Sequence, residues 1–138
     1  MTKKLMYVLV IYALFLVASI ELPVRYSPIA AAQAAEWYEG GTLHQANALQ
    51  WQKASDADKL ATCSDLVAAM YTSKSLKPEL QRTIKSVDDL KPLAEELVNA
   101  LDKAFPKNSN EKNNEKLYKN QIVADTAAML MLLMGWLK

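Results

Sequence analysis

The sequence is poor in the residues that build chemical sites. Its 138 residues include one cysteine, one histidine and three glycines. One cysteine cannot form an internal disulfide, and one histidine with one cysteine cannot supply the clustered ligands of a zinc site. The glycines form neither a glycine-rich phosphate loop nor a Gly-x-Ser-x-Gly elbow. We therefore expect no metal site, no cofactor and no enzymatic activity.

The chain also lacks an excess of charge of either sign. Of its 16 lysines and arginines, Lys3, Lys4 and Arg25 precede residue 35, and of its 15 acidic residues only Glu21 does, so the remainder is close to neutral. Charges of both signs are interspersed along it, with no block of five or more of one sign. This pattern argues against nucleic acid as a partner and against a polybasic membrane segment.

The N-terminus has the pattern of an export signal. Lys3 and Lys4 precede an uncharged apolar run, Leu5–Ile20, and positive residues before such a run stay in the cytoplasm while the following chain is translocated. Ala32-Gln33-Ala34 is a small-x-small tripeptide of the kind cut by signal peptidase. An earlier cut after Ser19 and retention of the run as an uncleaved signal anchor are the alternatives.

These signals divide the chain into a signal or anchor at 1–34 and one domain at 35–138. We expect a periplasmic protein. The alternative location is the inner membrane, reached through residues 5–20 if they are not cleaved.

The rest of the chain is expected to be all-α, as a small bundle of three to four helices. Apolar residues recur with a period near 3.6, and no stretch alternates with a period of two for long enough to predict a strand. The predicted helices are a short one capped by Thr42 and ending near Trp51, then Asp56–Tyr71, Pro78–Lys85, Val87–Phe105 and Glu115–Leu137.

Local signals support the two longest internal helices. Ser55 and Ser86 can accept hydrogen bonds as N-caps. Pro92 fits only in a first turn, and Pro106 ends the helix that it follows. The Asn-rich segment 107–114 contains no apolar residue, which predicts a solvated loop.

The last predicted helix has two interpretations after Ala127, where it becomes apolar on every side. Burial as the central helix of the bundle is the first, with Leu117 and Leu133 among its inner residues. The second is an exposed surface for a partner, because methionine adapts to irregular surfaces. The candidate interaction residues of that surface are Met129, Met131, Met134 and Trp136.

A second candidate site is the cluster of Trp37, Tyr38 and His44, whose aromatic and titratable groups could hold a ligand or a peptide. In the alternative interpretation, the two aromatic rings pack on the bundle and His44 is a surface residue. Cys63 shares the apolar spacing of its helix, so we expect a buried thiol rather than one that pairs with a partner chain.

In size and in its leader the chain is similar to acid-stress chaperones and helical immunity proteins of the periplasm. Both groups usually carry two cysteines, so no residue is carried over. We expect a non-enzymatic protein-binding or stress-protective module whose partner is another envelope protein or a second copy. The alternative is an anchored accessory subunit of an envelope complex.

Overall fold

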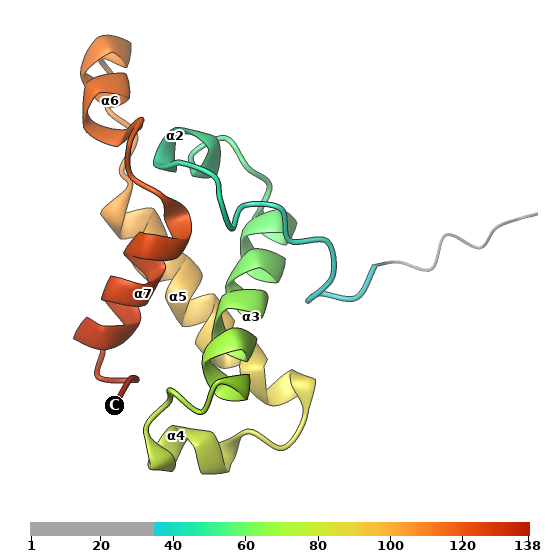
Figure 1. Ribbon diagram of the computed structural model, residues 1–138. Helices are drawn as coiled ribbons and strands as arrows, with labels where there is room; N and C mark the ends of the chain where they lie inside the picture. The colour runs from blue at the N-terminus through green and yellow to red at the C-terminus, as the bar shows by residue number, and fades with distance from the viewer. Residues whose placement is uncertain (1–34) are drawn as a thin grey trace, which may run out of the picture. The chain divides into compact units, whose positions relative to one another are not determined.

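The computed structural model describes residues 35–138, and this part of the chain is all-α as predicted (Figure 1). The signal, cleavage and anchor predictions fall on residues 1–34 and lie outside it. The elements are α2 (Ala48–Trp51), α3 (Asp56–Thr72), α4 (Pro78–Thr83), the 3-10 helix η1 (Val87–Leu90), α5 (Lys91–Ala104), α6 (Glu111–Tyr118) and α7 (Val123–Leu133).

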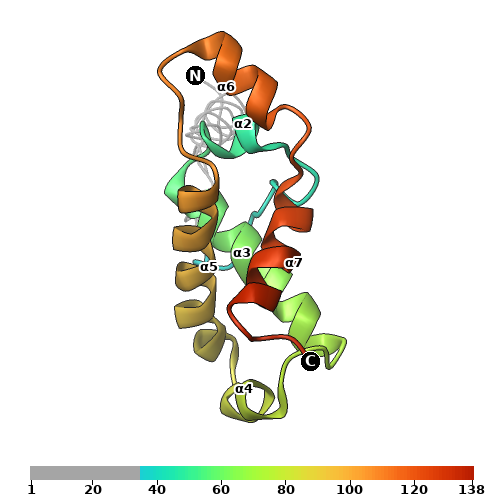
Figure 2. The same ribbon diagram turned by 90° about the vertical axis from the view of Figure 1, so that its left-hand side faces the viewer.

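Helix α5 is the central element of the core. It packs against both α3 and α7 (Figures 1 and 2). Its buried residues Ala94, Leu97 and Leu101 recur at i, i+3 and i+7, which is the stripe that the sequence predicts. The expectation that the C-terminal helix is central is therefore wrong, because the amphipathic α5 is the helix that contacts both of the other long helices.

A side-chain cap marks the start of α3, and prolines lie near both ends of α5. The Ser55 hydroxyl accepts a hydrogen bond from the Asp58 amide at 3.2 Å, as an N-cap does. Pro92 lies in the first turn of α5, where its missing N–H costs no helical hydrogen bond. α5 ends at Ala104, just before Pro106. The predictions for Ser55, Pro92 and Pro106 are confirmed. The predicted helix Val87–Phe105 is instead divided, because Val87–Leu90 after Ser86 forms the 3-10 helix η1 and α5 begins only at Lys91.

The first short helix begins later than predicted. Asn47, not Thr42, is the N-cap of α2, and it forms a capping box with Gln50. Residues 41–44 instead run along α3 and bond to its side chains. Thr42 could cap a helix by residue type, but tertiary contacts with α3 take its hydrogen-bonding groups.

The predicted helix Glu115–Leu137 is wrong in extent, because the chain is interrupted around Ile122. The Ala48 amide donates to the Gln121 carbonyl at 2.8 Å, and the Val123 amide donates to the Ala46 carbonyl at 2.9 Å. This short antiparallel bridge between Asn47 and Ile122 takes backbone groups that a continuous helix would use internally.

Helix α6 begins inside the segment predicted as a loop. Asn110 caps it by accepting a hydrogen bond from the Asn113 amide, and Asn114 is buried against α2. The polar composition of the segment did not predict this helix, because asparagines, which are typical of loops, form its N-cap and its buried contact.

Helix α7 ends at Leu133 rather than Leu137. Gly135 adopts φ +74, the Trp136 amide donates to the Met131 carbonyl, and the Gly135 amide donates to the Leu132 carbonyl. This is a Schellman motif, which favours glycine at the left-handed position. It turns Trp136 back into the core, where 6% of the residue is exposed.

A partly buried polar group ties α2, α3 and α5 together. Asp102 Oδ1 accepts hydrogen bonds from Lys59 Nζ at 2.8 Å and from Trp51 Nε1 at 2.9 Å. Lys59 also lies 5.3 Å from the centroid of the Trp51 ring, within the range of a cation–π contact. One carboxylate therefore satisfies two donors from different helices.

Candidate functional site

Trp37 lies against the start of α5, and Tyr38 packs on Trp37. Trp37 Nε1 donates to Asp88 Oδ1 at 3.2 Å, and Lys91 Nζ lies 5.6 Å from the centroid of its ring. The Tyr38 ring meets Trp37 edge-on, with centroids 5.4 Å apart. Trp37 is half-buried and packs on the core cluster. The indole is thus engaged by the protein itself through both its N–H and its ring face.

The segment Gly41–His44 is fastened along one face of α3. Both oxygens of the Asp58 carboxylate accept hydrogen bonds from Thr42, one from its amide and one from its hydroxyl, each at 2.7 Å. The Leu43 amide donates to the Thr62 hydroxyl at 3.2 Å. One turn further along α3, His44 Nε2 lies 3.0 Å from Asp65 Oδ2. The segment therefore follows α3 for two turns.

Hydrogen bonding alters the acidity of Asp58. Partial burial alone would raise the pKa of this carboxyl, but the hydrogen bonds from the hydroxyl and amide of Thr42 and the hydroxyl of Thr62 outweigh it. The result is a pKa below the ordinary value of 3.8. Asp58 is thus an ionised anchor for the segment rather than a proton donor.

Of the three residues predicted as an N-terminal site, Trp37 and Tyr38 contact each other through their rings, whereas His44 contacts the Asp65 carboxylate. Trp37 bonds to Asp88, next to the start of α5, and His44 pairs with Asp65 on α3. No sequence pattern showed these partners, because Trp37 and Asp88 are 51 positions apart and His44 and Asp65 are 21 apart.

The neighbouring acids Asp88 and Asp89 have separate structural roles. Asp89 Oδ2 accepts hydrogen bonds from the Lys85 and Ser86 amides and from the Ser86 hydroxyl, which lowers the pKa of Asp89. Asp88 accepts the Trp37 indole N–H. Asp89 therefore caps backbone amides, as expected for a first-turn carboxylate, and Asp88 holds the Trp37 indole.

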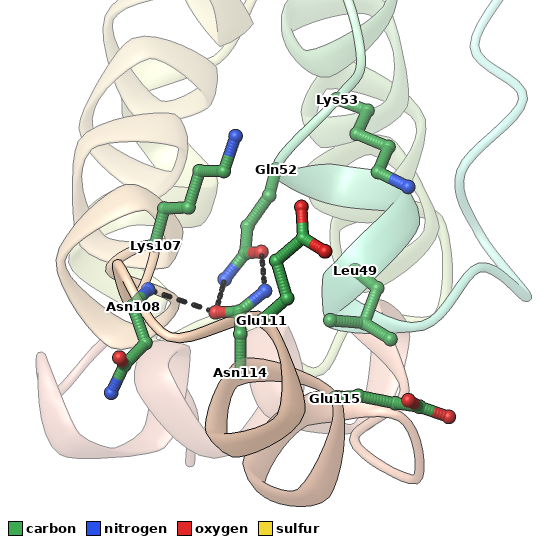
Figure 3. Close-up of a pocket in the computed structure, with 8 residues that line it drawn as sticks. All are labelled: Leu49, Gln52, Lys53, Lys107, Asn108, Glu111, Asn114 and Glu115. Carbon is green, nitrogen blue, oxygen red and sulfur yellow. Dashed lines mark hydrogen bonds between the residues drawn. The ribbon is translucent and has the colours of Figure 1, made fainter.

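A surface pocket of about 290 Å³ lies where α2 meets α6 (Figure 3). Asn114 Nδ2 donates to Gln52 Oε1 at 2.7 Å, and Gln52 Nε2 donates back to Asn114 Oδ1 at 3.2 Å. Asn114 Oδ1 also accepts from the Asn108 amide at 2.9 Å. The two central amides are thus occupied by each other and by the chain, and their bonds join α6 to α2.

The rim of this pocket carries charge of both signs, from Lys53, Lys107, Glu111 and Glu115 (Figure 3). None of its eight lining residues is a histidine, cysteine, serine or threonine. This arrangement therefore supplies no thiol or hydroxyl nucleophile and no imidazole base. Its amides hold the fold together.

The four candidate residues at the C-terminal end lie in different environments. Met129 is exposed, Met134 is half-buried, and Met131 and Trp136 are buried in the core. Met129 and Met131 diverge because residues two apart on a helix point to nearly opposite sides. The candidate residues therefore do not form one surface.

The exposed apolar surface of α7 consists instead of Met129, Leu132 and Leu133, with 58%, 57% and 75% of each residue exposed. We call these three residues the outer face of α7. The placement of Leu133 among the inner residues is wrong, as is that of Leu117 on α6, which is 53% exposed. A helix that is apolar on every side has no periodicity to show which side is buried.

Cys63 is fully buried, as predicted, and forms no disulfide. Burial raises the pKa of its thiol to about 12, with a further rise from the nearby Asp102 carboxylate. A neutral, inaccessible thiol is a poor nucleophile.

Within residues 35–138, no group of three or more histidine, cysteine or acidic side chains is placed to hold a metal ion. In the same range, no helix is both long and apolar enough to span a bilayer. Comparison of the chain with models of known protein families, with curated proteins and with solved structures finds no match.

Proposed function

We propose that this protein is a small, exported, non-enzymatic binding module of the cell envelope, and that the outer face of α7 is its binding surface. The exposure of Met129, Leu132 and Leu133 on one side of one helix carries the proposal. Burying a leucine or methionine side chain completely is worth about 1.5–3 kcal/mol, and more than half of that gain is still available on this face. Contiguous exposed apolar side chains mark binding surfaces.

The non-enzymatic part of the proposal is supported by how the reactive side chains are used. The imidazole of His44, the sole histidine of the chain, pairs with Asp65. Cys63 is buried, and its thiol is kept protonated. Neither residue is placed as one half of a nucleophile–base pair.

Export is proposed from the order of signals before the domain, which runs from Lys3 and Lys4 through Leu5–Ile20 to Ala32-Gln33-Ala34. Intact mass measured in separated cell fractions tests it. A periplasmic species that starts at Ala35 is expected. A cytosolic species with the whole leader would contradict export.

Binding through α7 is tested with a dye that fluoresces on apolar surfaces. The double variant Leu132→Ser, Leu133→Ser should lose most of the native dye signal. Leu117→Ser is the matched control, because Leu117 is also more than half exposed but lies on α6. Equal signals from the double variant, the control and the unchanged chain would overturn the proposal that α7 carries the binding surface.

The second candidate function is an accessory subunit anchored in the inner membrane by Leu5–Ile20. The absence of charge from that run favours it, since such a run can be retained in the bilayer. Extraction distinguishes the two candidates. An anchored subunit requires detergent, whereas release by osmotic shock identifies a free periplasmic domain.

A further inference from the structure

The C-terminal end of α7 is held beside the segment that connects α3 and α4. The Lys77 amide donates to the Trp136 carbonyl at 2.8 Å, and the Lys138 amide donates to the Ser75 carbonyl at 3.1 Å. These two bonds form an antiparallel bridge between Leu76 and Leu137. Side chains from three separate parts of the sequence are thereby brought to one end of α7.

Four cationic residues gather at this end, and we call them the basic cluster: Lys74, Lys77, Arg82 and Lys138. Lys74, Arg82 and Lys138 line one surface pocket of about 250 Å³. Lys77 Nζ lies 3.4 Å from the point where a side chain at Gly135 would begin. The cluster does not form a block of positive charge in the sequence, because its members span positions 74 to 138.

Little negative charge offsets the basic cluster. Within residues 35–138, the three lysines of the cluster form no salt bridge, and Arg82 contacts Glu79 only at 4.0 Å, with both side chains 74% exposed. At such exposure this pair contributes little. The cluster therefore presents cationic groups to solvent.

The bridge between Leu76 and Leu137 holds the basic cluster at the end of α7 that carries Leu132 and Leu133. Leu132 and Leu133 precede Gly135 by less than one helical turn, and Gly135 lies beside the Lys77 ammonium. From Thr126 to Leu137 the chain carries no charged residue. Exposed leucines and methionine next to lysines are the composition that binds bilayer interfaces, where apolar side chains enter the acyl boundary and cations meet lipid phosphates.

We propose that the outer face of α7 and the basic cluster together dock onto the surface of an anionic phospholipid bilayer. This inference rests on the proposed function, since it names the partner of the same surface. The docking is peripheral. Met129, Leu132 and Leu133 enter the interface, and the cationic side chains contact headgroup phosphates.

The size of the surface favours a bilayer over a second copy of the chain. A stable protein interface buries about 800 Å² on each partner, and the three large exposed apolar side chains of α7 are too few to supply that area by themselves. Interfacial lipid binding has no such minimum, because it grows with each buried apolar group and each cation. The excess positive charge of the basic cluster also finds its complement in anionic headgroups.

A fluorophore at one position tests the docking in the full chain, whatever residues 5–20 do. In the variant Leu133→Cys, a thiol-linked, polarity-sensitive dye reports on the outer face, while the fully buried Cys63 leaves the native background unlabelled. The matched control is Asn99→Cys, because Asn99 is exposed on α5 and lines a pocket with α3 residues rather than α7. The probes are vesicles of phosphatidylcholine with phosphatidylglycerol and vesicles of phosphatidylcholine alone.

The emission of the label at position 133 should shift to the blue with anionic vesicles, and that of the label at position 99 should not. Each cation near an anionic surface contributes about a fivefold gain in affinity, so Lys74→Gln, Lys77→Gln and Lys138→Gln together should weaken the response roughly a hundredfold. Added salt should weaken it as well.

Three results would overturn lipid docking. The first is an equal shift with neutral vesicles, and the second is no shift with either kind. The third is a shift without vesicles that grows with protein concentration, which would identify a second copy as the occupant. In each case the dye experiment on the serine variants separately decides whether the α7 surface, and with it the proposed function, survives.

Discussion

Replacement of Gly41 by alanine should release the segment that follows α3, and the reason is space rather than backbone conformation. A Cβ at this position would lie 2.6 Å from the Thr62 nitrogen and 2.8 Å from its Cα, which are helix backbone atoms that cannot move aside. The segment must therefore lift from α3.

The expected cost follows from the contacts beyond Gly41. Lifting the segment weakens two hydrogen bonds from Thr42 to the Asp58 carboxylate, each worth about 1.5–3 kcal/mol. It also exposes Leu43, which is 6% exposed in the native fold and whose full burial is worth about 1.5–3 kcal/mol. Loss of about half of this total lowers the free energy of unfolding by ~2–4.5 kcal/mol, or the melting temperature by roughly 10 °C or more.

Gly40 is the matched control for this experiment. Its φ of +86 makes alanine costly by ~1–2 kcal/mol, but a Cβ there would meet nothing within 4 Å. Urea unfolding should therefore rank Gly41→Ala as more damaging than Gly40→Ala. In an Asp58→Ala background the cost of Gly41→Ala should shrink, because the bonds that it breaks are already gone. A loss from Gly41→Ala no larger than that from Gly40→Ala would refute this reasoning.

Three further outcomes are expected. The pKa of Asp58 is lowered in the fold, so the stability contributed by this carboxylate is complete above its ordinary pKa of 3.8 and disappears as pH falls through the lower folded pKa. The free energies of unfolding in urea of the unchanged chain and of Asp58→Asn should therefore differ most at neutral pH. A difference that does not become smaller in acid would contradict this. Cys63, with its pKa raised to about 12, should react with a thiol reagent only as fast as the protein unfolds, so rapid labelling in native buffer would show that the site is open. Met131→Ala should cost ~2–5 kcal/mol in denaturant unfolding, whereas Leu133→Ala should stay within ~0.5 kcal/mol, and equal losses would mean that α7 is oriented differently.

The candidate sites could be predicted from sequence only as residue types. Trp37 and His44 could be predicted as candidates because one is aromatic and the other titratable. Their partners, Asp88 and Asp65, lie at distant positions in the sequence. The basic cluster could not be predicted, because its members are dispersed along the chain. Sequence spacing describes neighbours within one element, whereas a surface is assembled across elements.

The sequence by itself determined the all-α class and the positions of α3 and α5. Their apolar residues repeat with the helical period, and their ends carry caps and prolines that act within one turn, so the information is local. Gly135 is also a local stop signal for α7, but the helix predicted through Leu137 did not take it into account.

Only the tertiary structure decided where α6 and α7 separate and which side of α7 is exposed. No glycine or proline marks the break near Ile122; the break exists because pairing with Ala46–Ala48 uses backbone groups that cannot serve a helix at the same time. The side of α7 that is buried follows from its neighbour, since α5 covers one side of a helix that is apolar all round. The other side, with Leu132 and Leu133, is left to solvent.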